Sequence, residues 1–390
     1  MRPTLHNLQA LRGVACLMVF GMHLAVWESH YGIARPLLSP VLWYGYAGVD
    51  LFFVLSGFLI AHTQASAIGK PQELPGYLFR RAWRIYPTFW VMMLLTVVAF
   101  ETTGAAPPPA DGDRLGRWTT WLTLWPPNAP NLYVPVAWTL PYELLFYAAF
   151  GLLVVLPRRA APWLLVGWAA VVGIVAATTG WLHLSSFAVV RHAVNPHVWE
   201  FLLGCGIAAI IRQKFTRFGL VSVALGLAWA AAWIPAFNTA TTPYQMGMDP
   251  LLRVFVFGPA AALIVYGMVA VERRGGWVFP LWLQRIGDAS YSIYLWHAPV
   301  GILLHDWTAK WWDHKLLPHL GWLAMMTAVA VGGGMLLHGC VEKPLLGLFA
   351  RKRREERPPV VVAARVVGTP RALARAPCGR GEEFASSPRP

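Results

Sequence analysis

Long apolar stretches follow one another along the chain, with only short polar segments between most of them. Windows of about 20 apolar residues predict transmembrane helices, because a helix of that length crosses the hydrocarbon core of a bilayer. The pattern predicts an all-α integral membrane protein of about ten spans. We place the spans near residues 8–28, 43–63, 83–101, 136–156, 161–179, 198–212, 217–236, 251–271, 284–304 and 320–340.

Composition supports this interpretation. The 390 residues are 57% hydrophobic and 13% charged, with 21 Trp and a mean hydropathy of +0.49, whereas soluble domains average about 45–50% apolar and about 25% charged residues. The formal charge of +14 would suit a nucleic-acid partner. The basic residues lie in short clusters between spans and near the C-terminus, however, which is typical of membrane proteins. We therefore expect no nucleic-acid binding.

The distribution of Lys and Arg predicts the orientation of the chain. With a cytoplasmic N-terminus, the inner loops hold twelve basic residues and the outer loops hold six, in accord with the positive-inside rule. Both termini are then cytoplasmic. Residues 1–350 are predicted to form one transmembrane domain, and residues 351–390, which are basic and rich in Pro, a disordered cytoplasmic tail.

The first apolar stretch contains two ionisable residues, Arg12 and His23. Burying such groups in lipid costs several kcal/mol, so a span that carries two of them is expected to need both for function. Their separation in the sequence brings both side chains to nearly the same helical face, roughly 16 Å apart along the axis. The pair therefore predicts the two ends of one path through the membrane.

Four ionisable groups fall at a common depth in this topology. Each lies roughly 7–11 Å below the outer boundary of its span. Such groups are costly if each faces lipid alone, whereas groups around a polar cavity satisfy one another, and we expect them to cluster. A purely structural hydrogen bond stays the alternative for Asp50 or His297. The four groups are His23, Asp50, Glu143 and His297.

General acid–base catalysis is the chemistry that suits such a cluster. A histidine titrates near neutral pH and can take a proton from a hydroxyl, and a neighbouring carboxylate can orient its ring. We predict His23 as the base, supported by Asp50 and Glu143. Ser56 is expected to be a small helix-packing residue, which favours direct transfer, with an acyl-histidine as the alternative. The four cysteines are scattered without metal-ligand spacing, so no metal is expected.

Basic residues gather at the inner end of the third span. Arg81 and Arg84 share one helical face, a geometry that can clamp phosphate, and Arg12 is expected at the same level. Three arginines there predict a site for an anionic, phosphate-bearing donor whose reactive end extends toward His23. Anchoring to lipid phosphates is the alternative for this cluster. Two acidic residues near helix ends are expected to be structural: Glu200 and Glu342.

Six short segments, in a fixed order along the chain, resemble the motifs of a known family. The chain resembles acyltransferase family 3, a family of integral membrane acyltransferases, over nearly all of residues 5–350. Segments 7–13 and 138–143 are most similar to the exopolysaccharide O-acetyltransferases of that family. The six segments are Arg12-x10-His23, Gly-Val-Asp-Leu-Phe-Phe-Val-Leu-Ser-Gly-Phe-Leu-Ile (48–60), Arg81-x-x-Arg84, Trp-Thr-Leu-x-x-Glu (138–143), Gly-Asp-Ala-Ser-Tyr-Ser-Ile-Tyr-Leu-Trp-His (287–297) and Val-Glu-Lys-Pro-Leu (341–345).

The resemblance implies transfer of an acyl group, commonly acetyl from cytosolic acetyl-CoA or another acyl-CoA, to a hydroxyl of an extracytoplasmic or lipid-linked glycan. It implies binding of the donor by Arg12, Arg81 and Arg84 and catalysis by His23. Asp50 and Glu143 are the expected supports. The candidate substrate-binding residues in the matching segments are Trp138, Tyr291 and His297.

The expected setting is the bacterial inner membrane. The expected partners are a glycan or lipid-linked oligosaccharide, membrane lipids and the polysaccharide biosynthesis machinery. One alternative is a transporter or flippase of glycolipids or organic anions that uses the same cavity, although the chain shows no internal repeat of the kind that many transporters have. A second alternative is acyl transfer to a small molecule such as a macrolide.

Overall fold

The computed structural model describes residues 5–30, 37–38, 41–104, 114–125, 133–178, 188–237, 250–308 and 316–348. The chain divides into two units, Met1–Leu348 and Phe349–Pro390. The second unit, which contains the predicted tail of residues 351–390, lies outside the described residues. The fold described below is that of the first unit.

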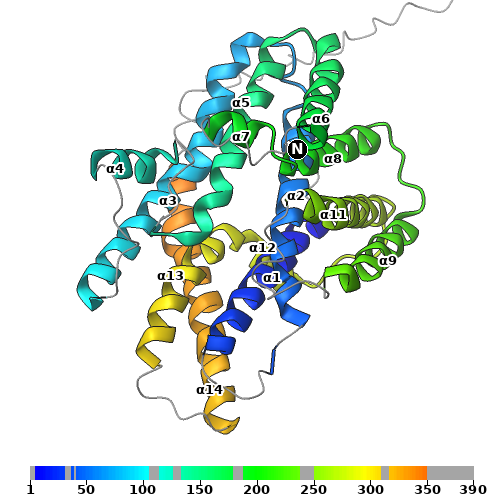
Figure 1. Ribbon diagram of the computed structural model, residues 1–390. Coiled ribbons are helices and arrows are strands. Elements are labelled where there is room, and N and C mark those ends of the chain that lie inside the picture. Colours follow the sequence, from blue (N-terminus) through cyan, green and yellow to red (C-terminus); the bar gives the residue numbers. More distant parts are fainter. Residues whose placement is uncertain are drawn as a thin grey trace, which may run out of the picture. The chain divides into compact units, whose positions relative to one another are not determined.

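Helices make up the ordered structure of the first unit, and its described residues contain no strand (Figure 1). Short 3-10 segments include Val41–Tyr46 before α2 and Pro135–Thr139 before α5. The helices are α1 (His6–His30), α2 (Ala47–Gln64), α3 (Leu74–Thr103), α4 (Arg114–Thr123), α5 (Leu140–Val155), α6 (Ala161–Thr178), α7 (Ala188–Ala193), α8 (His197–Arg212), α9 (Gly219–Phe237), α11 (Pro250–Arg273), α12 (Leu281–Asp288), α13 (Ser290–Thr308), α14 (Leu316–Thr327) and α15 (Gly333–Leu337).

The predicted fold class, an all-α integral membrane protein, is confirmed. Seven helical stretches within the described residues are long and apolar enough to cross a membrane, and Gly219–Trp233 is a shorter apolar helix. Each of the ten predicted ranges also contains a helix. Helices satisfy their backbone hydrogen bonds internally, which is what an apolar segment needs in lipid. The number of spans and the side of each terminus stay predictions.

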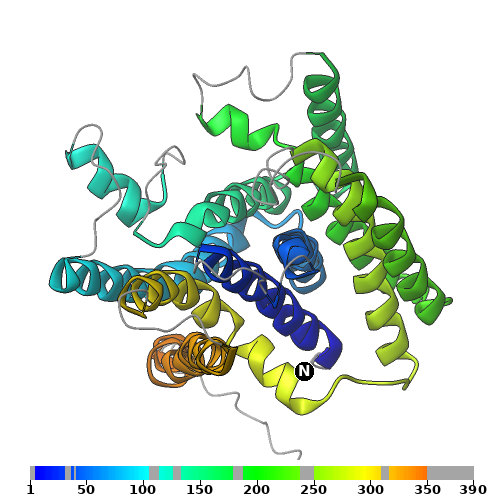
Figure 2. The ribbon, with the colours of Figure 1, turned by 60° about the horizontal axis from the view of Figure 1, so that its bottom comes forward.

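The helices α1 and α2 lie at the centre of the first unit, with the others around them (Figure 2). The most apolar window of the span that contains α2 is 78% buried, whereas the corresponding window of the α6 span is 11% buried. A lipid-facing helix needs no protein around it, but a helix that carries polar residues such as Asp50 and Ser56 does. The central position of α2 therefore places these polar residues away from lipid.

Small residues allow α2 to approach α8 closely. A Cβ atom at Gly57 of α2 would overlap the backbone carbonyl of Phe201, and one at Gly204 of α8 would overlap that of Val54. Backbones that touch in this way are held by van der Waals packing, which is the main attraction between helices in lipid. The contact fixes the position of the face of α2 that carries the polar residues described below.

The predicted ninth span, 284–304, is wrong as a single helix. The structure divides it into α12 and α13, with Ala289 between them. Gly287, near the end of α12, lies so close to α1 that a Cβ atom there would overlap the Gln9 carbonyl. A hydropathy window averages over both sides of such a boundary and therefore does not report it.

Candidate active site

A cavity of about 180 Å³ lies among α1, α2, α3, α5 and α13, and five of the nine predicted site residues line it. Arg12 comes from α1, Arg81 and Arg84 from α3, Glu143 from α5 and Tyr291 from α13. We call this cavity the arginine pocket. Its other lining residues are Val49, Phe52, Phe53, Leu55, Ser56, Leu59, Ile85, Thr139, Leu140, Tyr147, Ser290 and Tyr294.

The charges of the arginine pocket favour an anion. Three guanidinium groups face two carboxylates, Glu143 in the pocket and Glu342 behind Arg84, which leaves a formal excess of one positive charge. The Arg12 guanidinium donates a hydrogen bond to Gln9 Oε1 at 3.2 Å. The Arg81 guanidinium stacks over the Tyr147 ring at 5.3 Å. Guanidinium groups held in this way present planar donors that match phosphate.

Glu342 is the partner of Arg84, a role that its position in the sequence did not predict. Its carboxylate forms an ion pair with Arg84 and accepts a hydrogen bond from Ser292 Oγ at 2.7 Å. It also contacts His338 Nδ1 at 2.8 Å. The π-helical turn His338–Glu342 carries both residues, and such turns are frequent at functional sites. The structural role that we expected for Glu342 is thus to orient the Arg84 side chain.

Glu143 is held by a serine that we expected to serve only for packing. Ser56 Oγ donates to Glu143 Oε1 at 2.6 Å, and the Tyr147 hydroxyl donates to Glu143 Oε2 at 3.4 Å. Both partners line the arginine pocket. The carboxylate therefore belongs to the pocket and not to the surroundings of His23.

His23 and His297 form a pair next to the arginine pocket. The His297 Nε2 atom lies 3.4 Å from His23 Nδ1. His23 Nδ1 also lies 2.9 Å from the Val19 carbonyl oxygen, and His297 Nδ1 lies 3.1 Å from that of Ile293. A carbonyl oxygen only accepts, so each Nδ1 carries the proton and each Nε2 keeps its lone pair. We therefore assign to His23 the tautomer whose Nε2 can act as a general base.

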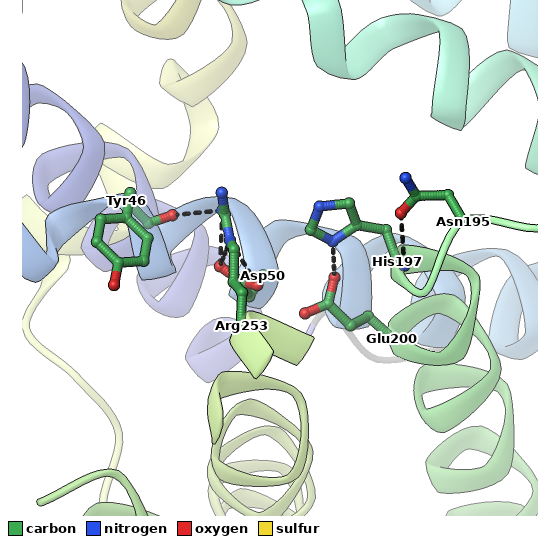
Figure 3. Close-up of polar contacts among 6 residues, drawn as sticks. All are labelled: Tyr46, Asp50, Asn195, His197, Glu200 and Arg253. Atoms are coloured by element: carbon green, nitrogen blue, oxygen red, sulfur yellow. Dashed lines mark hydrogen bonds and ion pairs between the residues drawn. The ribbon is translucent and has the colours of Figure 1, made fainter. Parts of the chain in front are cut away.

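The expected cluster of four ionisable groups does not form. His23 contacts His297, Glu143 lies in the arginine pocket, and Asp50 lies in a third, separate group on α2, α8 and α11 (Figure 3). Depth along a span is set by position in the sequence, but the direction of a side chain around the helix axis depends on which neighbour packs there. The predicted common depth was therefore insufficient to bring the four groups together.

Asp50 is paired with Arg253, which our candidate residues did not include. Arg253 Nε donates to both carboxylate oxygens of Asp50, at 3.0 and 2.9 Å, and Nη2 donates to Asp50 Oδ2 at 2.8 Å and to the Tyr46 carbonyl at 2.9 Å. Asp50 is fully buried and Arg253 nearly so. An arginine inside the predicted span 251–271 needs a counter-ion. Arg253 is therefore the feature of the sequence from which a buried acidic partner could have been predicted.

His197 and Glu200 complete this buried group. His197 Nδ1 lies 2.9 Å from Glu200 Oε2, and the His197 backbone N–H donates to Asn195 Oδ1 at 3.0 Å (Figure 3). Asp50, His197 and Glu200 place ligand atoms within 4.8 Å of one another, as a divalent cation would require. Arg253 already bonds both oxygens of Asp50, however, and supplies a cation there. We interpret the group as an ion-pair network that joins three helices.

The remaining candidates divide between the pocket and the surface. The Tyr291 hydroxyl donates to the Ile85 carbonyl at 2.8 Å, and its ring lies 5.4 Å from the Arg84 guanidinium carbon. Trp138 is 40% exposed and packs near Tyr142, with ring centroids 6.1 Å apart. Trp138 does not line the arginine pocket among the residues that the structure describes. Any substrate contact of Trp138 would therefore be made outside the pocket.

Comparison with known families decides the class of the protein. The model of an acyltransferase domain matches residues 5–338, which contain the arginine pocket and the histidine pair. The chain belongs to this acyltransferase family. Together with its apolar helices, the family identifies the protein as a membrane-bound O-acyltransferase. No solved structure is significantly similar to the chain.

Curated relatives of this acyltransferase have different names. The exopolysaccharide production protein ExoZ of Rhizobium meliloti is 29% identical over 327 residues, which cover 77% of this chain and 90% of the relative. The acyltransferase MdmB of Streptomyces mycarofaciens is 29% identical over 378 residues, covering 90% and 93%. The peptidoglycan O-acetyltransferase OatA of Listeria monocytogenes is 24% identical over 336 residues, covering 77% of this chain and 50% of the relative.

Proposed function

We propose that the protein transfers an acetyl group from cytosolic acetyl-CoA to a hydroxyl of an exopolysaccharide or another cell-surface glycan. The observation that carries the proposal is the pocket of three arginines next to a histidine whose Nε2 is free to take a proton. Arginines bind the phosphates of such a donor, and a histidine base activates a hydroxyl. The acyltransferase family supplies the reaction class.

The donor is proposed to bind with its phosphates at Arg12, Arg81 and Arg84, since these side chains supply the positive charge of the pocket. Its pantetheine arm then extends outward along α1. Arg12 and His23 are roughly 16 Å apart along the helix axis, a separation that an extended arm can span. Orientation of the donor in this way brings the thioester toward His23.

In the proposed step, the acceptor oxygen attacks the thioester carbonyl carbon. His23 Nε2 takes the hydroxyl proton, the C–S bond breaks as the new C–O ester bond forms, and the proton leaves on the CoA thiol. The Val19 carbonyl and His297 Nε2 accept from His23 Nδ1–H and stabilise the imidazolium that forms. These two acceptors take the place that we expected Asp50 or Glu143 to fill.

The proposed location is the bacterial inner membrane, with both termini and the tail of residues 351–390 in the cytoplasm. The excess of basic residues in the inner loops supports this orientation. The similarity to ExoZ and to the peptidoglycan O-acetyltransferase OatA supports a surface glycan, free or still lipid-linked, as the acceptor. The polysaccharide biosynthesis machinery would then supply the acceptor.

A second candidate acceptor is the hydroxyl of a small molecule such as a macrolide. The similarity to the acyltransferase MdmB favours it, because the similarity covers 90% of this chain and the name of this relative specifies no glycan. The donor site and the chemistry are the same for both acceptors. Only an assay that offers both kinds of acceptor to the enzyme distinguishes the two candidates.

The proposed function is tested with purified protein, radiolabelled acetyl-CoA, and polysaccharide from a strain that lacks the gene. We expect label in the polysaccharide and one CoA released for each acetyl group transferred. We also expect the polysaccharide of the deletion strain to have lost acetyl mass increments. A transporter or flippase would move ligand without releasing CoA, and that result would contradict the proposal.

Arg81→Ala is expected to raise the KM for acetyl-CoA by roughly tenfold, because one charge-assisted hydrogen bond to phosphate is lost. Arg81 forms no ion pair with a carboxylate in the described residues, so its removal leaves no buried acid unpaired. Steady-state kinetics at varied acetyl-CoA give the value. Arg80→Ala is the matched control, since Arg80 does not line the pocket. An unchanged KM in Arg81→Ala would contradict donor binding and would favour anchoring of the arginine cluster to lipid phosphates.

His297→Leu is expected to lower kcat by about fivefold, the effect of one lost hydrogen bond to the base, while the KM for acetyl-CoA stays the same. His297→Gln keeps an acceptor and is expected to retain more activity. Kinetics with acceptor and donor varied in turn measure both constants. If His297 binds substrate instead, the KM for the acceptor will rise in both variants and kcat will not change.

A further inference from the structure

Neither histidine of the pair lines the arginine pocket, although both lie on helices that do. On α13, Tyr294 lines the pocket, whereas His297, one helical turn further along, does not. On α1, Arg12 lines the pocket and His23 does not. A donor that binds at the arginines must therefore extend its thioester past the level of Tyr294 before it reaches His23.

The ring of Tyr294 lies next to residues of both sites. Its centroid lies 5.8 Å from that of Phe52, which lines the pocket, and 5.9 Å from that of His297, which does not. The side chain is buried. One aromatic ring thus contacts both the donor side and the catalytic side.

Two polar atoms of the 3-10 segment Pro135–Thr139 hold this ring in place. The Tyr294 hydroxyl donates to the Val136 carbonyl oxygen at 3.0 Å and lies 3.1 Å from Thr139 Oγ1. Thr139 itself lines the pocket. Net stabilisation by a hydrogen bond of this type is about 1 kcal/mol, so binding energy from a donor can break it.

We propose that Tyr294 is a movable barrier that decides whether the acyl group is transferred to the acceptor hydroxyl or to water. In the closed position its ring separates the donor pocket from His23. Entry of the pantetheine arm turns the ring aside and breaks its contacts with Val136 and Thr139. The inference rests on the proposed function, because it assumes a thioester donor in the arginine pocket.

The reason for such a barrier is the competing hydrolysis of the donor. Water at His23 can replace the acceptor: its oxygen bonds to the acyl carbon, the C–S bond breaks, and acetate and CoA leave. A ring that closes the passage keeps water from the thioester until the donor arm is fully seated. Loss of the barrier is therefore expected to change the partition between transfer and hydrolysis more than donor binding.

The test compares CoA release without acceptor with acetyl transfer in its presence, for the parent protein, Tyr294→Phe and Thr139→Val. Tyr294→Phe removes the hydroxyl and keeps the ring. Thr139→Val keeps Tyr294 and removes the threonine hydroxyl that contacts the Tyr294 hydroxyl. Tyr266→Phe is the matched control, because it also removes a hydroxyl bonded to a backbone carbonyl, that of Arg217 at 2.7 Å, away from the pocket. Size-exclusion profiles establish that each variant is folded.

We expect acceptor-independent CoA release to rise about fivefold in Tyr294→Phe and to rise also in Thr139→Val, whereas Tyr266→Phe keeps the parent rate. If Tyr294→Phe fails to fold, the rate of CoA release in Thr139→Val tests the barrier instead. An unchanged ratio of hydrolysis to transfer in the folded variants overturns the barrier alone. Failure of the parent protein to release CoA from acetyl-CoA, with or without acceptor, overturns the proposed function and the barrier together.

Discussion

His23→Ala is expected to lower kcat for acetyl transfer by roughly 10²- to 10⁴-fold, the usual contribution of a positioned general base. The structure leaves Nε2 of His23 as the atom that can take the acceptor proton, because Nδ1 donates to the Val19 carbonyl. The KM for acetyl-CoA is expected to stay near the parent value, since His23 does not line the arginine pocket. Radiolabel transfer from acetyl-CoA measures both constants.

His305→Ala is the matched control for this experiment. His305 also lies on a helix of the bundle, α13, but contacts Asp306 and does not line the pocket. NMR of the surface polysaccharide gives a second readout in cells. O-acetyl groups retained at parent levels in a strain that expresses His23→Ala would rule out His23 as the base.

Arg253→Ala is expected to have the largest effect on stability. It leaves the fully buried Asp50 without its cation, and breaking a buried ion pair in this way costs about 3–5 kcal/mol. Thermal unfolding in detergent should show a clear fall in the midpoint. The variant is expected to lose activity in proportion to the folded protein that is lost, because Arg253 does not line the arginine pocket.

A double variant separates this structural role of Asp50 from the catalytic one that we predicted from the sequence. Asp50→Asn with Arg253→Gln removes both charges of the pair and is expected to recover much of the stability that Arg253→Ala loses. Activity per folded molecule should recover with it. A stable but inactive double variant would instead assign Asp50 to catalysis, through a contact that only the substrate complex contains.

The helices could be predicted from the sequence because lipid imposes a simple rule on the backbone. An apolar window must form a helix to satisfy its own hydrogen bonds, and all ten windows contain one. The ends were harder to predict. Helix α3 begins at Leu74, before the predicted residue 83, because its first turns are too polar for a hydropathy window. The division between α12 and α13 lies next to a close contact of Gly287 with α1, a long-range contact that no local pattern reports.

The sequence predicted that the three arginines lie close together, but it did not predict the partners of the acidic residues. The level that Arg12 was expected to share with Arg81 and Arg84 agrees with their common cavity. Their proposed role in donor binding stays a prediction. Asp50 lies on a face of α2 that meets Arg253 of α11, and its contacts in the structure are not with His23. Glu143 meets Ser56 of α2, a residue that we had set aside as packing.

The sequence by itself determined the class of protein, the helical character of its apolar segments and the order of the motifs. These properties depend on apolar length and on residue spacing along single helices. Only the tertiary structure decided which polar groups meet: Arg84 with Glu342, Asp50 with Arg253, and His23 with His297. The physical reason is that each pair joins residues far apart in the chain, and contact between two helices depends on their packing faces, which the spacing within one helix does not specify.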